Sequence, residues 1–183
     1  MDLQIAAVLL PLLGWAVHGS VLAHRLASAR RDPLTGLHTR AGWTARAEHC
    51  IRRHPSAAVL LVDLDHFKTL NDTHGHAAGD AALIATADRL RTWCGRNGTA
   101  GRLGGDEFVA VVQDMAAADL DALASVLNRP MPYNGGLLPL AASVGVCRVT
   151  ELPVPLLTDA LAAADAAMYA SKGRSRRGSR LSH

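Results

Sequence analysis

The chain is poor in aromatic residues and in cysteine. Its 183 residues include three Trp, two Tyr and two Phe, so a hydrophobic core must be built mainly from Leu, Val and Ala. The three cysteines, Cys50, Cys94 and Cys147, are odd in number and scattered. This excludes a disulfide framework and predicts reduced, mostly buried thiols. A chain of this length has room for one ordinary domain and a short appendage.

The chain also lacks a broad excess of basic residues. The formal net charge is +3, but the segment from Lys172 to His183 contains five basic residues and no acidic one. The rest of the chain therefore has a net charge of −2, the difference between +3 and +5. We accordingly predict no nucleic-acid partner. Residues 179–183 are expected to form a basic, disordered tail, with weak binding to an anionic surface as the alternative.

Residues 3–23 contain no formally charged side chain and are rich in Leu, Val and Ala. As a helix, this run would span about 30 Å, the thickness of the hydrocarbon core of a bilayer. Asp2 precedes the run, and Arg25, Arg30 and Arg31 follow it. The positive-inside rule then places the following domain in the cytoplasm. We predict membrane association through a single-pass anchor in the inner (cytoplasmic) membrane.

Residues 1–31 are thus assigned to an apolar anchor helix and a short linker. Pro11, Gly14 and His18 weaken the membrane span, so a dimerising helix or a helix on the membrane surface stays open as an alternative. A cleaved signal peptide is a further alternative, with 27–29 as the cleavage site, although the positive charges follow the apolar run instead of preceding it.

Helical and strand patterns alternate after the linker. The continuous apolar run at 57–63 predicts a strand covered on both faces, and the run at 108–112 predicts another. We also expect a strand at 140–146 and helices at about 40–53, from Asp80 onward, at 116–127 and at 156–171. This order predicts an α/β (α+β) fold with a mixed central sheet flanked by helices.

The segment Gly104-Gly105-Asp106-Glu107-Phe108 predicts a hairpin with an acidic tip. Its glycines allow the backbone to turn and leave no side chain to block a ligand. Two adjacent acids concentrate negative charge that a bound cation would neutralise. A solvated acidic turn without a ligand is the alternative.

Two further carboxylates, Asp63 and Asp65, lie at the end of the apolar run at 57–63. Residues two apart on a strand point to the same face, about 7 Å from each other. Carboxylates at the end of a buried strand are typical of two-metal nucleotide enzymes, and Mg²⁺ prefers one or two carboxylates plus phosphates and water. For Asp65, the cap of a helix that starts at His66 is an equally good interpretation.

Two other segments suggest nucleotide binding. Asn71 and Asp80 flank a tight turn, and an amide with a carboxylate could recognise the polar edge of guanine. Alternatively, Asn71 is a turn residue and Asp80 a helix cap. Lys172 and Arg176 follow the last helix, where they could contact a triphosphate or complement the helix dipole.

Taken together, these motifs resemble the GGDEF family of diguanylate cyclases. The resemblance runs from residue 32 to residue 177 and rests on Asp32-Pro33-Leu34-Thr35-Gly36-Leu37 with Arg40, Asp63-Leu64-Asp65-His66-Phe67-Lys68, Asn71-Asp72, Gly75-His76-Ala77-Ala78-Gly79-Asp80, Arg102 with Gly104 to Phe108, Ser143-Val144-Gly145-Val146, and Ala164-Asp165-Ala166-Ala167-Met168-Tyr169 with Lys172 and Arg176. It implies a catalytic domain at 32–178 with a nucleotide-cyclase or polymerase-palm-like, ferredoxin-like core.

The resemblance implies an enzyme that condenses two GTP into cyclic di-GMP and two pyrophosphates. It implies a Mg²⁺ cofactor, or Mn²⁺ in its place, and a homodimer in which each subunit holds one GTP. The implied metal ligands are Asp63, the Leu64 carbonyl, Asp106 and Glu107. The implied catalytic residues are Asp106, Glu107 and Lys68.

The resemblance also implies a set of substrate-binding residues. Asn71 and Asp80 would recognise guanine, with His76 near the nucleotide. The phosphates would lie against backbone amides around Phe67 and against three cations, which are Lys68, Lys172 and Arg176.

Two departures from the family pattern stand out. Many members carry an inhibitory Arg-x-x-Asp site just before the hairpin, but Gly95 and Gly98 occupy these positions here, so we predict no inhibitory site. Thr39 stands where Asn is usual, at the domain entry. A catalytically weak or inactive module that binds GTP or heterodimerises is the alternative function, and an interaction scaffold without a nucleotide is a third hypothesis.

Overall fold

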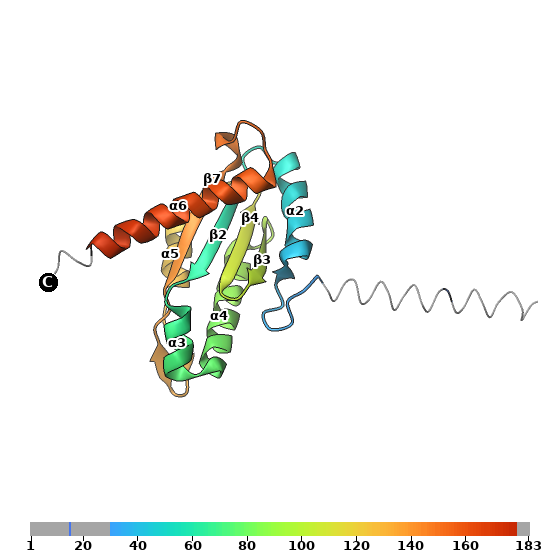
Figure 1. Ribbon diagram of the computed structural model, residues 1–183. Helices are drawn as coiled ribbons and strands as arrows, with labels where there is room; N and C mark the ends of the chain where they lie inside the picture. Colours follow the sequence, from blue (N-terminus) through green and yellow to red (C-terminus); the bar gives the residue numbers. More distant parts are fainter. Residues whose placement is uncertain (1–14, 16–29, 179–183) are drawn as a thin grey trace, which may run out of the picture.

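The computed structural model describes Trp15 and residues 30–178, with side chains in the second range described as far as Lys172. Figure 1 shows its helices and strands. In chain order these are β1 (His38–Thr39), α2 (Arg40–Arg53), β2 (Ala58–Leu64), α3 (Phe67–His74), α4 (His76–Cys94), β3 (Gly98–Gly104), β4 (Glu107–Val112), α5 (Leu120–Leu127), β5 (Met131–Tyr133), β6 (Gly136–Leu138), β7 (Ala142–Arg148), the short 3-10 helix η1 (Val149–Glu151) and α6 (Leu157–Gly178).

The main sheet has the strand order β1-β3-β4-β2-β7. Strand β2 pairs antiparallel with both β4 and β7, while β1 pairs parallel with β3. The sheet is therefore mixed, and helices cover both of its faces, as Figure 1 shows. This confirms the fold class expected from the alternating sequence pattern. The predicted N-terminal helix at 3–23 lies outside the described residues, apart from Trp15.

Alternation along β2 and β4 divides the core between the two faces of the sheet. Ala58, Leu60 and Val62 pack with α4 and α5 on one face. Val59 and Leu61 pack with α2 and α6 on the other face. Because successive side chains of a strand point to opposite faces, β2 needs apolar residues at every buried position. This explains why the unbroken apolar run was a reliable strand signal.

The three cysteines are free thiols. Cys94 and Cys147 are buried and Cys50 is half-buried, as the sequence analysis expected. Burial raises the pKa of the Cys94 thiol to about 12. Thr39 is the N-cap of α2, where its hydroxyl accepts a hydrogen bond from the amide of Gly42 at 3.4 Å. Thr therefore fulfils the capping role that Asn would have at this departure from the family pattern.

Several predicted boundaries were wrong. Helix α4 begins at His76, four residues before Asp80, because Gly75 with φ 83° breaks the chain between α3 and α4. Asp80 is therefore not a helix cap. Helix α5 begins at Leu120 instead of residue 116, because Asp119 caps it by accepting a hydrogen bond from Ala122.

The last strand and the last helix also differ from their predicted bounds. Helix α6 continues to Gly178, beyond the predicted end at 171, and β7 covers Ala142–Arg148 instead of 140–146. No helix in the described part of the chain is long and apolar enough to cross a membrane. The predicted tail at 179–183 lies outside the described residues.

Candidate active site

The hairpin predicted at Gly104 to Phe108 is confirmed. Strands β3 and β4 are antiparallel, and Gly104 pairs with Glu107, which leaves Gly105 and Asp106 as the turn. Gly105 has φ 50°, in the left-handed region that glycine enters without steric cost. A side chain at Gly105 would meet no atom within 4 Å, so the space over the turn is open.

An arginine that the sequence analysis left without a role holds this turn in place. The Arg102 guanidinium donates hydrogen bonds to the carbonyl of Gly105 at 2.7 and 3.0 Å. It also forms an ion pair with Asp32 at 3.1 Å. Asp32 in turn accepts hydrogen bonds from the amide and hydroxyl of Thr35. The hairpin tip is thus tied to the segment that opens the domain.

The pKa of Asp32 is lower than its ordinary value. Burial acts to raise this pKa, but the hydrogen bonds from Thr35 and the hydrogen bond and charge of Arg102 outweigh it. The carboxylate is therefore ionised and paired at neutral pH. Only the three-dimensional structure shows this pair, because its members are 70 residues apart.

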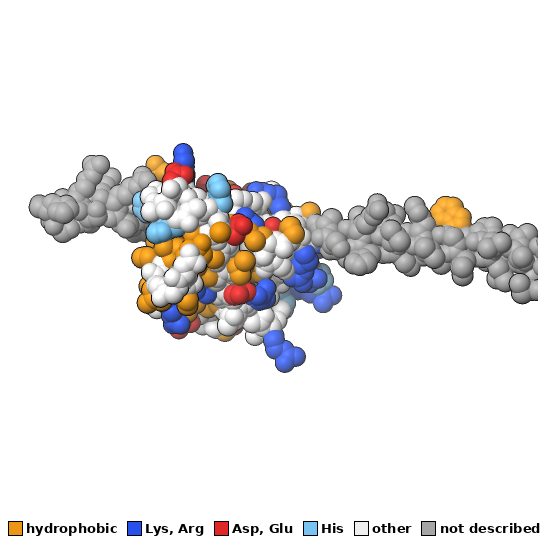
Figure 2. Space-filling view, turned by 90° about the horizontal axis from the view of Figure 1, so that it is seen from below, with side chains coloured by type: hydrophobic (Ala, Val, Ile, Leu, Met, Phe, Trp, Pro, Cys, Tyr) orange, Lys and Arg blue, Asp and Glu red, His pale blue; other side chains and the backbone are white. Residues whose placement is uncertain are grey.

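Two acids from different strands face each other at the same end of the sheet. Asp63 of β2 is directly opposite Glu107 of β4 in the antiparallel register. The amide of Leu64 donates to the carbonyl of Asp106 at 3.4 Å, which brings the hairpin tip against the end of β2. Figure 2 shows this end of the molecule from below. The predicted juxtaposition of Asp63 with the acids of the hairpin is confirmed at the level of the backbone register.

Lys172 brings a positive charge to these acids. Its ammonium lies 2.6 Å from Asp63 and 3.6 Å from Asp65. Both carboxylates therefore point to the same face of the sheet, as the sequence analysis predicted. Burial lowers the pKa of Lys172, but the hydrogen bond and charge of Asp63, helped by Asp65, outweigh this and raise it.

Helix α6 reaches this position because it lies in close contact with β7. A side chain at Gly145 of β7 would overlap the carbonyl oxygen of Ala164 and come within 2.6 Å of the Met168 Cβ. One turn beyond Met168, the same helix carries Lys172 over the end of β2. Glycine at position 145 is thus what allows the helix to approach closely enough.

Asp65 is not a helix cap. The N-cap of α3 is His66, in the left-handed conformation and without a side-chain capping bond. The carboxylate of Asp65 instead accepts a hydrogen bond from the Ser143 hydroxyl, at 2.8 Å to one oxygen and 3.0 Å to the other. Ser143 stands out in the sequence only as part of a strand motif, and only the β2–β7 register brings it beside Asp65.

The residues predicted to recognise guanine lie on α3 and α4, which follow β2. Asn71 of α3 packs directly over Gly79 of α4, where an added Cβ would overlap its amide oxygen and lie 2.9 Å from its Cγ. Asp80, next to Gly79, is exposed, and so is His76 in the first turn of α4. Asn71 and Asp80 are therefore brought close together by a contact that requires glycine.

The remaining predicted substrate-binding residues differ in how closely they approach the acids of the site. Phe67 is half-buried and begins α3, and Lys68 is exposed in the first turn of that helix. The side chain of Arg176 lies outside the described residues. Of the three predicted phosphate cations, the structure places only Lys172 against the acids of the site.

The donors at this end of the sheet fit a hard divalent cation. They are carboxylates and a backbone carbonyl, and the ammonium of Lys172 already stands among the carboxylates as a cation. No group of three or more His, Cys, Asp and Glu side chains that could hold a metal ion occurs in the part of the chain that the structure describes. A Mg²⁺ site does not need three such side chains, because Mg²⁺ keeps water and phosphate ligands beside one or two carboxylates. The assignment of Asp63, Leu64, Asp106 and Glu107 as ligands stays a prediction.

A cavity beside α2 lies away from these acids. Among its lining residues is Gly98, one of the two glycines at the predicted missing inhibitory site. A Cβ at Gly98 would lie 3.0 Å from the carbonyl oxygen of Val111, so this position has little room for a side chain. Gly95 lies in the turn after α4, with φ 52°.

Comparisons with known proteins identify the family of the chain. Residues 29–178 match the family described as diguanylate cyclase, GGDEF domain. The chain is 82% identical over 180 residues to a 19.3 kDa protein from the repSA 5′ region of Streptomyces ambofaciens, with 98% of each chain covered. It is 36% identical over 138 residues to the diguanylate cyclase DgcN of Escherichia coli K12, which covers 70% of this chain and 34% of that protein.

A similar fold is found in a solved structure. The crystal structure of a sensory box/GGDEF family protein from Caulobacter crescentus CB15 has a TM-score of 0.73 and 38% sequence identity, and the match covers 80% of this chain and 99% of that chain. The match covers about a third of the length of DgcN. The activity of the whole DgcN protein is therefore not carried over to this chain. From the family match over 29–178 and the hairpin geometry, we conclude that the chain belongs to the GGDEF domain family of diguanylate cyclases.

Proposed function

We propose that this chain is an active diguanylate cyclase that condenses two GTP into cyclic di-GMP and two pyrophosphates. The observation that carries the proposal is the pairing of Asp63 with Glu107 across β2 and β4, beside the hairpin tip and under the ammonium of Lys172. Carboxylates from neighbouring strands with a nearby cation form a site suited to a metal-bound triphosphate.

Asp63, the Leu64 carbonyl, Asp106 and Glu107 would hold Mg²⁺ or Mn²⁺, which would supply positive charge to the phosphate oxygens. Glu107 is exposed at the start of β4, where it could also accept the proton of the attacking 3′-hydroxyl.

The substrate would be held by the helices that follow β2. Asn71 and Asp80 would bind the guanine edge, the acid accepting from its N–H groups, with His76 beside the nucleotide. The first amides of α3, at Phe67 and beyond, are free of intrahelical partners and suited to a phosphate.

Three cations would complete phosphate binding. Lys68, Lys172 and Arg176 would contact the triphosphate and stabilise the charge of the departing pyrophosphate. On this proposal Lys172 exchanges its carboxylate partners for phosphate oxygens when GTP binds.

The reaction requires a homodimer. The family uses GTP and typically acts as a dimer. Each subunit would present one GTP, and each 3′-hydroxyl would attack the α-phosphorus of the other GTP. Two phosphodiester bonds form and two pyrophosphates leave, while the two hydroxyl protons pass to the base or to water. Dimerisation is then a natural point of control.

The test is to incubate the purified full chain with GTP and Mg²⁺ and to measure cyclic di-GMP by chromatography. Asp106→Ala should abolish product without loss of the fold, because it removes a carboxylate from an open turn. Asp121→Ala, at an exposed position of α5, is the matched control and should stay as active as wild type. An Asp106→Ala protein with wild-type activity would overturn the metal assignment.

A weak or inactive module that binds GTP or heterodimerises is the second candidate. It is favoured by the ion pair of Lys172 with Asp63, which has to open before a metal can bind. Binding of GTP without formation of cyclic di-GMP, in the presence of Mg²⁺ or Mn²⁺, would support this candidate over the first.

We further propose that residues 3–23 anchor the chain in the cytoplasmic membrane, with residues 32–178 on the cytoplasmic side. The support is the length of the uncharged run and the arginines that follow it. Fractionation of cells that express the full chain tests this. Recovery in the membrane pellet after a carbonate wash supports the anchor, and recovery in the supernatant contradicts it.

A further inference from the structure

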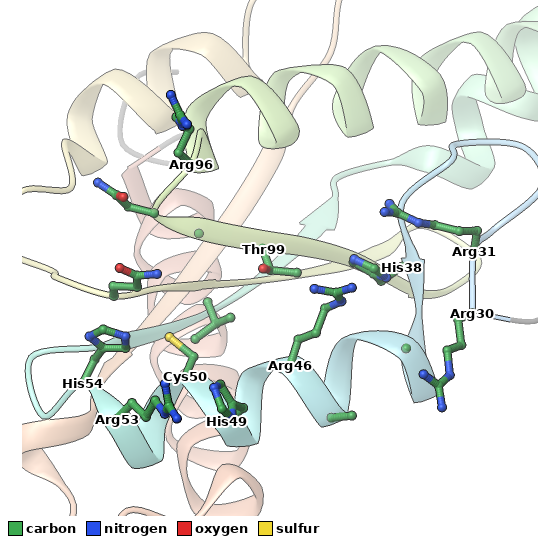
Figure 3. Close-up of a pocket in the computed structure, with 16 residues that line it drawn as sticks. Arg30, Arg31, His38, Arg46, His49, Cys50, Arg53, His54, Arg96 and Thr99 are labelled. Carbon is green, nitrogen blue, oxygen red and sulfur yellow. The ribbon is translucent and has the colours of Figure 1, made fainter. Parts of the chain in front are cut away.

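A cavity of about 810 Å³ lies beside α2, on the side of the sheet edge formed by β1 and β3. Figure 3 shows the residues that line it. One wall is a face of α2, and the opposite wall is formed by β1, by the start of β3 and by the end of β4. The proposed cyclase reaction uses none of its side chains.

The lining carries positive charge and no negative charge. It contains no Asp or Glu. Its basic residues are five arginines and three histidines: Arg30, Arg31, Arg46, Arg53, Arg96, His38, His49 and His54. Within the part of the chain that the structure describes, none of the five arginines forms an ion pair. By contrast, Arg52, next to Arg53 but outside the cavity, pairs with Glu48.

His38, in the wall of this cavity, has one ring nitrogen without a hydrogen-bond partner. Its side chain is only 8% exposed, and among the described residues its Nδ1 has no hydrogen-bond partner. Burial lowers the pKa of His38, and the charges of Arg31 and Arg46 lower it further. The ring is also within reach of the Arg30 backbone carbonyl, so Nδ1 alone is left without a described partner.

The arginines are spread along the cavity. Arg46 and Arg53 lie on the same face of α2, seven residues and therefore about 10 Å apart. In Figure 3, Arg30 and Arg31 lie at one end, Arg46 faces His38 in the middle, and Arg53 and Arg96 lie toward the other end. A single small anion cannot contact both ends, so the arrangement suits a ligand with several linked anionic groups.

We propose that this cavity binds a soluble small molecule with a linear chain of two or more phosphates, such as a nucleoside polyphosphate or an inorganic polyphosphate. Arginine is the side chain best suited to phosphate, because its planar guanidinium donates two parallel hydrogen bonds. Arg46 and Arg53 bind separate phosphates of the chain, and His38 faces them from the opposite wall. The volume lies in the range of small-molecule sites.

The test is a calorimetric titration of the purified full chain with orthophosphate, pyrophosphate and tripolyphosphate, in buffer with EDTA and no Mg²⁺. Affinity should rise along this series. Arg46→Gln and Arg53→Gln should each weaken the binding of tripolyphosphate about tenfold or more, because each removes a charge-assisted hydrogen bond. Arg52→Gln is the matched control on the same helix and should change affinity less than twofold.

A second readout reports directly on the wall of the cavity. Saturation with tripolyphosphate should shift the ¹⁵N resonances of the His38 ring in the wild type, and Arg53→Gln should need about ten times more ligand for the same shift. Equal losses in Arg52→Gln and Arg53→Gln, or no binding of tripolyphosphate by wild type, would overturn the proposal.

Lipid headgroups share phosphate chemistry, so the source of the phosphate is tested separately. Vesicles of phosphatidylglycerol, mixed with the same variants, should bind no less well to Arg46→Gln and Arg53→Gln than to Arg52→Gln. If these two substitutions weaken vesicle binding while tripolyphosphate does not bind, the cavity is a lipid site and the proposal fails. The inference does not depend on cyclase activity, since binding is measured without GTP or metal.

Discussion

Lys172 and Asp63, which are 109 residues apart in sequence, meet in an ion pair of 2.6 Å that joins the last helix to the central strand. The pair depends on the contact of α6 with Gly145 on the neighbouring strand β7. It places the one lysine of α6 among the carboxylates of β2. The position of the last helix therefore determines the charge balance of the candidate active site.

Replacement of Lys172 should affect activity far more than folding. Lys172→Met should lower the turnover of GTP about 100-fold, because a cation that stabilises developing charge on the phosphates is lost. Lys172→Arg should recover part of the rate. Initial rates of cyclic di-GMP formation measure this, with circular dichroism to confirm the fold. A Lys172→Met protein with wild-type turnover would contradict the role of this side chain.

The ion pair between Asp32 and Arg102 should stabilise the domain at neutral pH. Both side chains are largely buried, so Asp32→Asn should lower the free energy of unfolding by about 1–3 kcal/mol at pH 7. Urea denaturation measures the difference, and Asp121→Asn, at an exposed position, serves as the control.

The same pair predicts the direction of a pH dependence. Because the pKa of Asp32 is lowered in the folded state, its stabilisation is present above its ordinary pKa of 3.8 and is lost as the pH falls through the lower folded value. The gap between wild type and Asp32→Asn should therefore close below pH 3.8. A gap of constant size from pH 7 to pH 2.5 would show that the carboxylate charge is not responsible.

Gly145→Ala should destabilise the domain and misplace Lys172. The added methyl would overlap the carbonyl oxygen of Ala164, so α6 must move away, at a cost of about 3 kcal/mol. Gly136→Ala is the matched control, since the nearest atom to its added Cβ is 3.8 Å away, and it should change stability by less than about 0.5 kcal/mol. Equal denaturation midpoints for the two variants would contradict the close packing of α6 on β7.

Gly79→Ala should impair substrate binding through Asn71. An added Cβ would displace the Asn71 amide, so the KM for GTP should rise about tenfold, the loss of one hydrogen bond of about 1.4 kcal/mol. Asn71→Ala should have a similar effect, and the double variant should be no worse than either single one. Additive effects of the two substitutions would show that Gly79 does not act through Asn71.

Cyclic di-GMP should leave the initial rate of the purified enzyme unchanged. Gly95 and Gly98 replace the Arg and Asp of the inhibitory site, and Gly98 has little room for a side chain. Strong inhibition by low micromolar product would contradict this prediction.

The local features of the fold were predictable from sequence because local interactions produce them. The apolar run of β2 and the glycines of the hairpin specify backbone conformation within a few residues. Helix α3 was predicted only as an alternative, through a cap at Asp65, since none of its eight residues is buried. The start of α4 was displaced because Gly75, which separates the two helices, carries no capping side chain.

The sequence by itself determined the family, the alternation of strands and helices, and the candidate site residues at the end of β2 and in the hairpin. Only the tertiary structure decided which of them meet. It set Asp63 opposite Glu107, paired Asp65 with Ser143 instead of a helix end, and placed Arg46 and Arg53 of α2 in the lining of a cavity. These contacts join residues far apart in the chain, so they depend on strand register and on how closely helices approach the sheet, which no local pattern encodes.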